Sequence, residues 1–525
     1  MQGTSGSEVR DGLSTVTRGT LVLLISTLCL VGLNFVSRVI LVRSILPDDW
    51  SAFSIGLTLT SILVAVGTLG LPSAVARMLP YASTDPERRS IVRGTLIVGS
   101  LAGAASGVAL WLAAPILGPL LGPPGTTLAF RFFAVGVGTT ILATLVASVF
   151  QGYEDVTPNA LFLQIVNPGL LVAFLAAAFL LPGHALSFLA ALVSYAAASL
   201  LTLALSVVYL LRRLPRRLPA GPRAPGAFDR LLAFAMPLFV VGVMSSIMGG
   251  ADTLVLGVYH PSEVGTYTAT LTLARLIQIG VGAASYIFLP VAARFLRNDD
   301  RESVALTYTT VTKWMILFSL PLFVLFFFLP AASLGFVYTS KYATVTLPLQ
   351  LAVAGAFATT LLGPGPTTQV AYGEARLLAY NATIAGVADV VLAFALVPSE
   401  GYVGAAIAWS VAATIYAALS VLELAVGKGL HPFRQHFVIP LLATAVPVGI
   451  VLAVLRPTVV WWLLPPIGLA IAGLFIVIVL ATGSIDSGDL LLLETTEGIV
   501  GRPLPWLRRL GRLVRRTRAP PRPPS

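Results

Sequence analysis

The stretch RVILVRSILPDDWSAFSIGLTLT, residues 38–60, returns in altered form as DTLVLGVYHPSEVGTYTATLTLA, residues 252–274. The two stretches are 214 residues apart, and this offset places Pro47 over Pro261. Both lie inside long apolar segments of the chain. A membrane bundle that is present twice in one chain is typical of transporters, which place their substrate path between the two halves.

The composition predicts a membrane protein. Of the 525 residues 57% are hydrophobic and only 10% are charged, and the mean hydropathy is +0.91. A soluble fold of this composition would have too little polar surface to cover itself. Apolar segments of about 20 residues, long enough to cross a bilayer as helices, recur along the chain. We predict an all-α integral membrane protein with about fourteen transmembrane helices, near 19–43, 51–76, 91–117, 128–150, 160–181, 185–211, 231–258, 264–292, 310–331, 345–371, 377–397, 402–426, 437–455 and 459–481.

The basic residues predict the orientation, because cytoplasmic loops retain Lys and Arg. Most of the 33 lysines and arginines fall on the inner side if both termini are cytoplasmic. The prolines and charges around residue 215 predict a linker between two lobes of six spans each, and both lobes then enter the membrane in the same direction. The predicted domains are a cytoplasmic N-terminus 1–18, an N-lobe 19–211, a basic cytoplasmic linker 212–230, a C-lobe 231–426, two further helices 427–481 and a basic cytoplasmic tail 482–525.

Enzyme chemistry is not indicated by the sequence. The four histidines form no metal-ligand pattern with carboxylates or cysteines, and the single Cys29 can form no internal disulfide. We therefore expect no enzyme activity, no cofactor, no metal and no catalytic residue. The net charge of +11 is accounted for by topology and lipid contact, so no nucleic-acid partner is expected. The arginine-rich tail is either an interfacial helix on anionic lipid or a solvated segment.

Several blocks of the sequence resemble one family of membrane proteins. The first, FVSRVILVRSILPDDWSAFSIGLTLTSILVAVGTLGLPSAVARMLP from Phe35, resembles the opening of Wzx-type oligosaccharide flippases, members of the multidrug/oligosaccharidyl-lipid/polysaccharide exporter superfamily. The other blocks are FAMPLFVVGVMSSIMGGADTLVLGVYHPSEVGTYTATLTLA from Phe234, IFLPVAARF from Ile287, GPGPTTQVAYGEARL from Gly363 and LVPSEGYVGAAIAWSVA from Leu396. The resemblance extends from about Thr17 to Leu493.

The resemblance implies a flippase. Such a protein would move a lipid-linked oligosaccharide of the polyprenyl-phosphate type from the cytoplasmic to the outer leaflet, by alternating access between the lobes, for surface polysaccharide or glycoprotein assembly. It implies a multi-pass protein of a prokaryotic plasma membrane, with membrane lipids and glycosyltransferases, a polymerase or a ligase of the same pathway as partners. A cation-coupled multidrug or small-molecule antiporter of the same superfamily is the first alternative. A non-transporting scaffold of a glycan-assembly complex is the second.

Four charged residues within the predicted spans are candidates for the mechanism. Arg38, Asp252, Arg275 and Asp389 each need a partner, water or a function, because an ionised side chain costs about 3 kcal/mol or more at the bilayer centre. Arg38 and Asp252 occupy equivalent positions of the repeat, and Arg275 lies at a similar predicted depth. These three residues are the candidates for substrate binding or gating.

Two arrangements of these charges are open at the sequence level. In the first, Arg38 and Asp252 face a central cleft and pair when the outside is shut, so that Arg38 and Arg275 can bind the phosphates of the lipid carrier when it opens. In the second, Asp252 pairs with Arg275 within one helical hairpin, and Arg38 extends toward the membrane surface. Asp389 is either a protonatable group for ion coupling or a buried hydrogen-bonding residue.

Polar and helix-breaking residues give two further candidates. Four amide side chains near the inner ends of spans four and five either line a sugar path or join helices by hydrogen bonds; they are Gln151, Asn159, Gln164 and Asn167. The run Gly363, Pro364, Gly365 and Pro366 must interrupt span ten, either as a hinge or as a tolerated kink. Arg43 is expected to extend toward the membrane interface.

Overall fold

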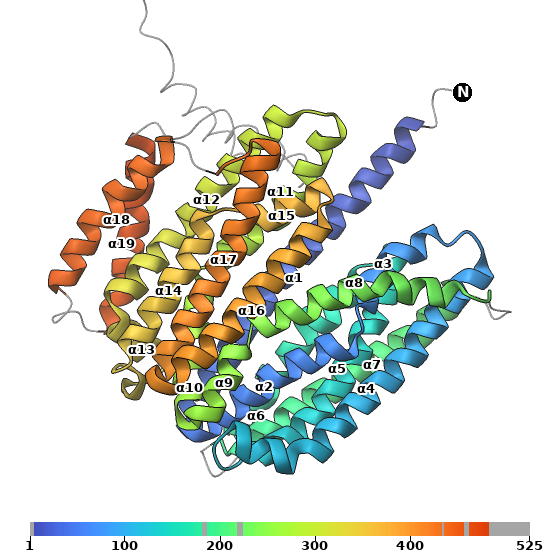
Figure 1. Cartoon of the computed structure of the whole chain (residues 1–525), viewed down its shortest axis with the longest axis horizontal. Helices are drawn as coiled ribbons and strands as arrows, with labels where there is room; N and C mark the ends of the chain where they lie inside the picture. The colour runs from blue at the N-terminus through green and yellow to red at the C-terminus, as the bar shows by residue number, and fades with distance from the viewer. Residues whose placement is uncertain (1–4, 181–185, 218–223, 433–434, 456–460, 482–525) are drawn as a thin grey trace, which may run out of the picture.

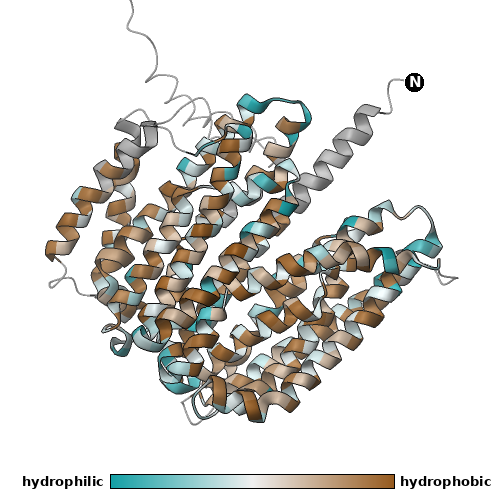
Figure 2. Ribbon diagram, in the orientation of Figure 1, coloured by the Kyte–Doolittle hydropathy of each residue, from teal (hydrophilic) through white to brown (hydrophobic). Residues whose placement is uncertain are grey.

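A computed structural model describes residues 5–180, 186–217, 224–432, 435–455 and 461–481. Every regular element in these ranges is helical, so the predicted all-α fold is confirmed for them (Figure 1). Figure 2 shows hydrophobic residues along most of the helices, as expected for a protein whose solvent is lipid. The predicted tail 482–525 lies outside the described residues.

The helices follow the same order in both halves of the chain. The first half contains α1 (Ser5–Ser44), α2 (Pro47–Gly67), α3 (Leu71–Met78), α4 (Asp85–Leu121), α5 (Thr126–Gly152), the π-helix η2 (Asn159–Val166), α6 (Asn167–Leu180) and α7 (Phe188–Arg217). The second half contains α8 (Ala227–Met248), α9 (Ala251–Tyr259), the short η3 (Pro261–Glu263), α10 (Val264–Leu276), α11 (Ile279–Arg297), α12 (Arg301–Phe328), α13 (Pro330–Val337), α14 (Thr346–Leu361), α15 (Gly365–Tyr372), α16 (Ala375–Glu400) and α17 (Tyr402–Lys428). The last helices are α18 (Gln435–Leu455) and α19 (Leu464–Ala481).

The chain is a multi-pass membrane protein. Within the described ranges, 11 helices are long and apolar enough to cross a membrane, and two shorter apolar helices lie at Ala445–Leu455 and Leu464–Ile478. The predicted span 264–292 is divided into α10 and α11, with the break at Ile277 and Gln278. The total of fourteen spans stays a prediction.

The predicted linker 212–230 is shorter in the structure. Helix α7 continues through Pro215 to Arg217, and α8 begins at Ala227. A proline in the last turn removes only one intrahelical hydrogen bond, so the helix can pass through it before it ends.

The helices form two groups that meet at one end of the molecule (Figure 1). One group contains α2 to α7 and the other α10 to α17, and α18 and α19 pack against α12. Helix α1 contacts η2 and α6 of the first group and α11 of the second, while α8 contacts α3 and α16. The groups converge where α2, α9 and α10 meet, and they diverge toward the end at which α1 begins. The first helix of each half therefore bridges the two groups.

The contact between α2 and α10 joins residues that are equivalent in the repeat. The hydroxyl of Thr268 donates to Ser54 Oγ at 3.0 Å, and the amide of Gly265 donates to Ser51 Oγ at 2.8 Å. Each pair is separated by 214 residues. A residue that contacts its own counterpart must lie beside the symmetry axis. The pseudo-two-fold axis of the repeat therefore passes between α2 and α10.

Close packing at this axis requires a glycine. A Cβ atom at Gly265 would lie 2.7 Å from Ser51 Oγ and 2.8 Å from the carbonyl oxygen of Pro47. The indole of Trp50 donates to the carbonyl of Gly265 at 2.9 Å. The backbone of α10 thus approaches α2 directly, and a buried aromatic side chain fills the space beside it.

A disulfide should form across the axis. We expect the double variant Ser54→Cys, Thr268→Cys, made with Cys29→Ser, to cross-link on mild oxidation because the two hydroxyl oxygens are 3.0 Å apart. Proteolysis between α7 and α8 followed by gel electrophoresis would show the fragments held together until a reductant is added. Each single-cysteine variant serves as the control, and separate fragments after oxidation of the double variant would contradict the contact.

Candidate functional site

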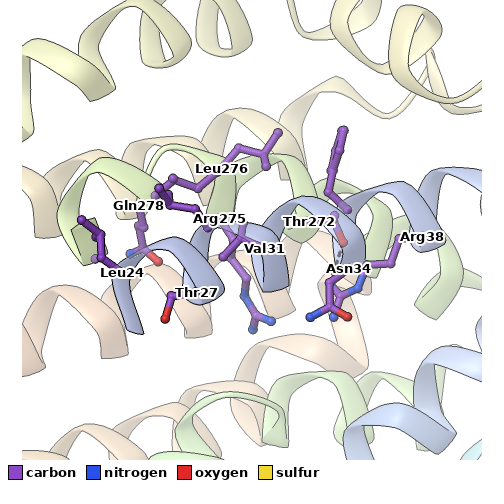
Figure 3. Close-up of a pocket in the computed structure, with 13 residues that line it drawn as sticks. Leu24, Thr27, Val31, Asn34, Arg38, Thr272, Arg275, Leu276 and Gln278 are labelled. Carbon is purple, nitrogen blue, oxygen red and sulfur yellow. Dashed lines mark hydrogen bonds between the residues drawn. The ribbon is translucent and has the colours of Figure 1, made fainter. Parts of the chain in front are cut away.

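A cavity of about 240 Å³ lies between α1 and the helices α10 and α11 (Figure 3). The positions of α1 that line it recur every three or four residues, which is the spacing of one helix face. Its lining residues are Leu24, Thr27, Leu28, Val31, Asn34, Phe35 and Arg38 of α1, with Thr272, Arg275, Leu276, Gln278, Ile279 and Gly282. The cavity therefore has walls from both halves of the chain.

Two arginines from different halves of the chain line this cavity. Arg38 donates through Nη1 to Thr272 Oγ1 at 2.9 Å, and Arg275 donates through Nη2 to the carbonyl oxygen of Gly249 at 3.1 Å. Figure 3 shows both guanidinium groups and the amide of Asn34 on the same side of α1 and α10. Over the described part of the chain, no carboxylate forms an ion pair with either arginine. Each guanidinium has five N–H donors, so most of them stay available to an anion.

Asp252 is hydrogen-bonded within its own half of the chain and forms no ion pair with these arginines in the described ranges. It is fully buried in the first turn of α9, where Oδ1 accepts from the amide of Thr253 at 2.7 Å and Oδ2 accepts from the hydroxyl of Tyr267. Neither ion pair suggested by the sequence, Arg38 with Asp252 or Asp252 with Arg275, is formed among the described residues. The reason is a break between α8 and α9 at residues 249–250, inside the segment predicted as one continuous helix.

Asp389 lies near Asp252 in the second half. It is fully buried on α16, and neither of its carboxyl oxygens has a hydrogen-bond partner within the described ranges. The charges of Asp389 and Asp252 are close enough to interact, and Tyr267 lies beside both. We call Asp252, Tyr267 and Asp389 the acidic group. Whether Asp389 serves ion coupling or is a buried hydrogen-bonding residue stays a prediction.

Two of the four amide residues, Gln164 and Asn167, take part in contacts between helices. Gln164 Oε1 accepts from the hydroxyls of Ser26 at 2.7 Å and Thr27 at 3.0 Å, both on α1. Its Nε2 donates to Asn159 Oδ1 at 3.2 Å, within the π-helix. Asn167 donates to Thr202 of α7 at 3.3 Å. Gln151 is exposed near the end of α5.

Arg43 contacts the second half of the chain. Its Nε donates to the carbonyl of Val337 at 2.8 Å and its Nη2 to the carbonyl of Phe336. These carbonyls belong to the last turn of α13, where a positive charge is favourable. The side chain therefore joins the end of α1 to the second half of the chain.

The predicted interruption of span ten is present. Helix α14 ends at Leu361 and α15 begins at Gly365, while Gly363 has a φ of +72°. A Cβ at Gly363 would lie 2.3 Å from Thr312 Oγ1, so only glycine fits this turn. Whether this break is a hinge stays a prediction.

One charged residue within a span was missed by the sequence analysis. Glu423 lies on α17 and accepts hydrogen bonds from Gln369 of α15 and Asn381 of α16. A carboxylate inside the predicted span 402–426, with no basic residue at i±3 or i±4, is the signal that could have identified it.

Comparison with known proteins identifies relatives of the chain and of its fold. A family model described as "Polysaccharide biosynthesis protein" matches residues 16–296. The lipid II flippase MurJ in an inward closed conformation has a TM-score of 0.68 at 15% identity, over 87% of this chain and 98% of that one. An inward-facing multidrug resistance MATE family transporter of the MOP superfamily has a TM-score of 0.61 at 15% identity, over 78% and 98%. A comparison with curated proteins finds no match.

A third similar structure is described by the polarity of its binding pocket. A MOP superfamily transporter from Pyrococcus furiosus, described as having reverse polarity of its binding pocket, has a TM-score of 0.54 at 14% identity, over 78% of this chain and 97% of that one. At these identities the likeness concerns the fold. The family model confirms the predicted relation to polysaccharide biosynthesis proteins, and the solved structures confirm the predicted fold.

Substitution of Gln164 distinguishes a structural amide from a substrate contact. We expect Gln164→Leu to lower the free energy of unfolding by about 1 kcal/mol, because hydrogen bonds between membrane helices contribute about 0.6 kcal/mol each and Gln164 accepts two from α1. Thermal unfolding of the purified protein measures the change. Gln151→Leu, at an exposed position, should leave the stability unaltered. An unaltered stability of Gln164→Leu with impaired transport would instead indicate a sugar path.

Proposed function

We propose that this chain, which belongs to the polysaccharide biosynthesis protein family, is a flippase that moves a lipid-linked oligosaccharide from the cytoplasmic to the outer leaflet. The observation that supports this proposal most directly is the pair Arg38 and Arg275, which come from opposite halves of the chain and face one cavity. In a membrane protein an ionisable side chain of this kind indicates a substrate path.

The chemistry of the cavity suits a phosphate on a lipid. Guanidinium groups bind phosphate oxygens through paired hydrogen bonds, and no carboxylate among the described residues forms an ion pair with these two. The remaining walls are mostly apolar, with Leu24, Val31 and Leu276 among them, and would tolerate the first part of an isoprenoid chain. At about 240 Å³ the cavity is smaller than ordinary ligand pockets of roughly 300–1,000 Å³. In this conformation it would hold the phosphate group and not a whole oligosaccharide.

The arrangement of the two groups of helices supports alternating access. They meet at the end where α2 contacts α10 and diverge toward the end at which α1 begins. With both termini in the cytoplasm, as the basic residues predict, this conformation faces inward. Opening to the other side would then separate Ser54 from Thr268 and rock the N-lobe, 19–211, against the C-lobe, 231–426. The break at Gly363 to Pro366 would serve as a hinge within the C-lobe.

The acidic group would couple transport to an ion gradient. Asp389 and Asp252 are both fully buried, and no described cation forms an ion pair with either. Two buried carboxylates cannot stay ionised together without a proton or a metal cation between them. We infer that Asp389 binds the coupling ion, assisted by Asp252.

A cation-coupled antiporter for small molecules is the alternative function. The acidic group favours it, because such a protein needs an ion site. The two arginines in the cavity disfavour cationic drugs as substrates, since like charges repel.

We also propose that the flippase lies in a prokaryotic plasma membrane. Its partners in the pathway would be glycosyltransferases, a polymerase or a ligase.

The arginine pair gives the decisive test. We expect Arg38→Gln and Arg275→Gln each to lower the flipping rate at least tenfold, because each removes a charged contact to phosphate worth about 1.5–3 kcal/mol. The rate is measured in proteoliposomes from the exposure of a polyprenyl-diphosphate-linked oligosaccharide to an external lectin.

Arg131→Gln is the matched control, because that arginine is exposed and lies over the ring of Trp111, 5.7 Å from its centre. A double variant of Arg38 and Arg275 that flips at the normal rate would refute the assignment of the phosphate site. If the native protein exports drugs, and neither it nor the variants flip the lipid-linked oligosaccharide, the antiporter is favoured.

Asp389 gives an independent test of ion coupling. We expect Asp389→Asn to abolish the dependence of the flipping rate on an imposed pH or sodium gradient, because the neutral amide can neither take up a proton nor balance a cation. Flipping is followed with each gradient applied separately, and Asp299→Asn, at an exposed loop position, is the control. A variant that still responds to both gradients would exclude Asp389 as the coupling residue.

A further inference from the structure

A second polar cluster lies in the helices α15, α16 and α17, apart from the cavity and the acidic group. Its centre is Glu423, which is half-buried on α17 and five residues before the helix ends at Lys428. One carboxyl oxygen, Oε2, accepts from Gln369 Nε2 at 2.5 Å and from Asn381 Nδ2 at 2.8 Å. Both amide donors are almost completely buried. Two helices of the C-lobe, α15 and α16, thus direct amide side chains to one carboxylate on α17.

The charge of Glu423 is not balanced by a cation. In the described part of the chain no Lys, Arg or His forms an ion pair with it. The lysine at the end of the same helix, Lys428, is bound to Glu374 at 2.9 Å and lies 5.2 Å from the ring centre of Tyr372. Neutral amides can donate hydrogen bonds to a carboxylate, but they do not compensate its charge.

An unsatisfied oxygen lies in the same cluster. Gln369 has no exposed surface, and its Oε1 has no hydrogen-bond partner among the described residues. This oxygen belongs to the amide whose nitrogen contacts Glu423, so it is held beside the carboxylate. Buried amide oxygens are nearly always hydrogen-bonded. The cluster therefore contains both an uncompensated negative charge and a buried acceptor without a donor.

The break in span ten borders this cluster. Helix α15 begins at Gly365, where a Cβ would lie 3.2 Å from the Cβ of Ser420. Ser420 Oγ in turn lies 3.4 Å from Asn381 Nδ2. Broken helices in transporters commonly supply oxygens to cation sites inside the membrane.

We propose that Glu423, Gln369 and Asn381 form a binding site for a small monovalent cation, with Na⁺ as the ion that fits it. Carboxylate and amide oxygens are the ligands that hard cations prefer. Rotation of an amide by half a turn exchanges its nitrogen for its oxygen, so each amide can donate to Glu423 when the site is empty and coordinate the cation when it is filled. The hydroxyl of Ser420 is a fourth oxygen at the site.

The site is distinct from the acidic group. Asn381 and Asp389 are eight residues apart on α16, which is about 12 Å along the helix. The inference does not depend on the proposed transport of a lipid-linked oligosaccharide, because it concerns ion binding by the protein at rest.

The test measures stabilisation of the full-length protein by sodium. We expect NaCl to raise the midpoint of thermal unfolding in detergent relative to choline chloride at equal ionic strength and pH, since a ligand of the native state stabilises it. Glu423→Gln should weaken the apparent Na⁺ affinity at least tenfold. Glu374→Gln is the matched control, because that carboxylate lies in the turn between α15 and α16 and is already paired with Lys428. The comparison is repeated in an Asp389→Asn background to remove the acidic group.

A second variant covers the case in which Glu423→Gln does not fold. Gln369→Leu keeps the carboxylate but removes the unsatisfied oxygen, and it should also weaken the apparent affinity for Na⁺, measured as binding of radioactive sodium. Equal responses of the native protein, Glu423→Gln and Gln369→Leu would overturn the proposal. An equal response to choline chloride, or a response to pH without one to Na⁺, would overturn it as well.

Discussion

The contact between α2 and α10 on the pseudo-two-fold axis is the constraint on which the rest of the structure depends. Ser54 touches Thr268 and Ser51 touches Gly265, and each residue meets its own counterpart in the repeat. The contact can form only because Gly265 carries no side chain. It brings the two groups of helices together at one end, close to the place where α1 and α10 contact each other. The cavity with Arg38 and Arg275 lies between these two helices.

The second constraint is electrostatic. A charged side chain inside a membrane needs an ion-pair partner, water or a function. Among its described residues this protein contains both cations and anions that form no ion pair. Directly after the break at residues 249–250, Asp252 is hydrogen-bonded to Tyr267, and it forms no ion pair with Arg38 or Arg275 in the described ranges. The cavity is lined by the two arginines, while the acidic group lies in the interior of the second half. A positive cavity suits an anionic lipid carrier, and a separate acidic site suits a coupling cation.

The repeat is symmetric in its backbone and asymmetric in its chemistry. Arg38 and Asp252 occupy equivalent positions, yet one lies in a long uninterrupted helix and the other in the first turn of a short one. The starts of α7 and α17, Phe188 and Tyr402, keep the same separation of 214 residues. Duplication therefore preserved the order of the helices, and local breaks gave the second half its own polar sites. Two such breaks follow α8 and α14, where the first half has the uninterrupted helices α1 and α5.

The sequence by itself determined the solvent, the helical class, the family and the repeat, because these depend on hydrophobicity, segment length and residue order along the chain. It also identified Arg38 and Arg275 as charges at similar depth and the interruption at Gly363 to Pro366. Only the tertiary structure decided which way each side chain faces, since helix rotation and the break before Asp252 follow from packing between distant segments. For the same reason Gln164 was assigned to a contact with α1, and Glu423 was recognised only when α15 and α16 brought their amides to it.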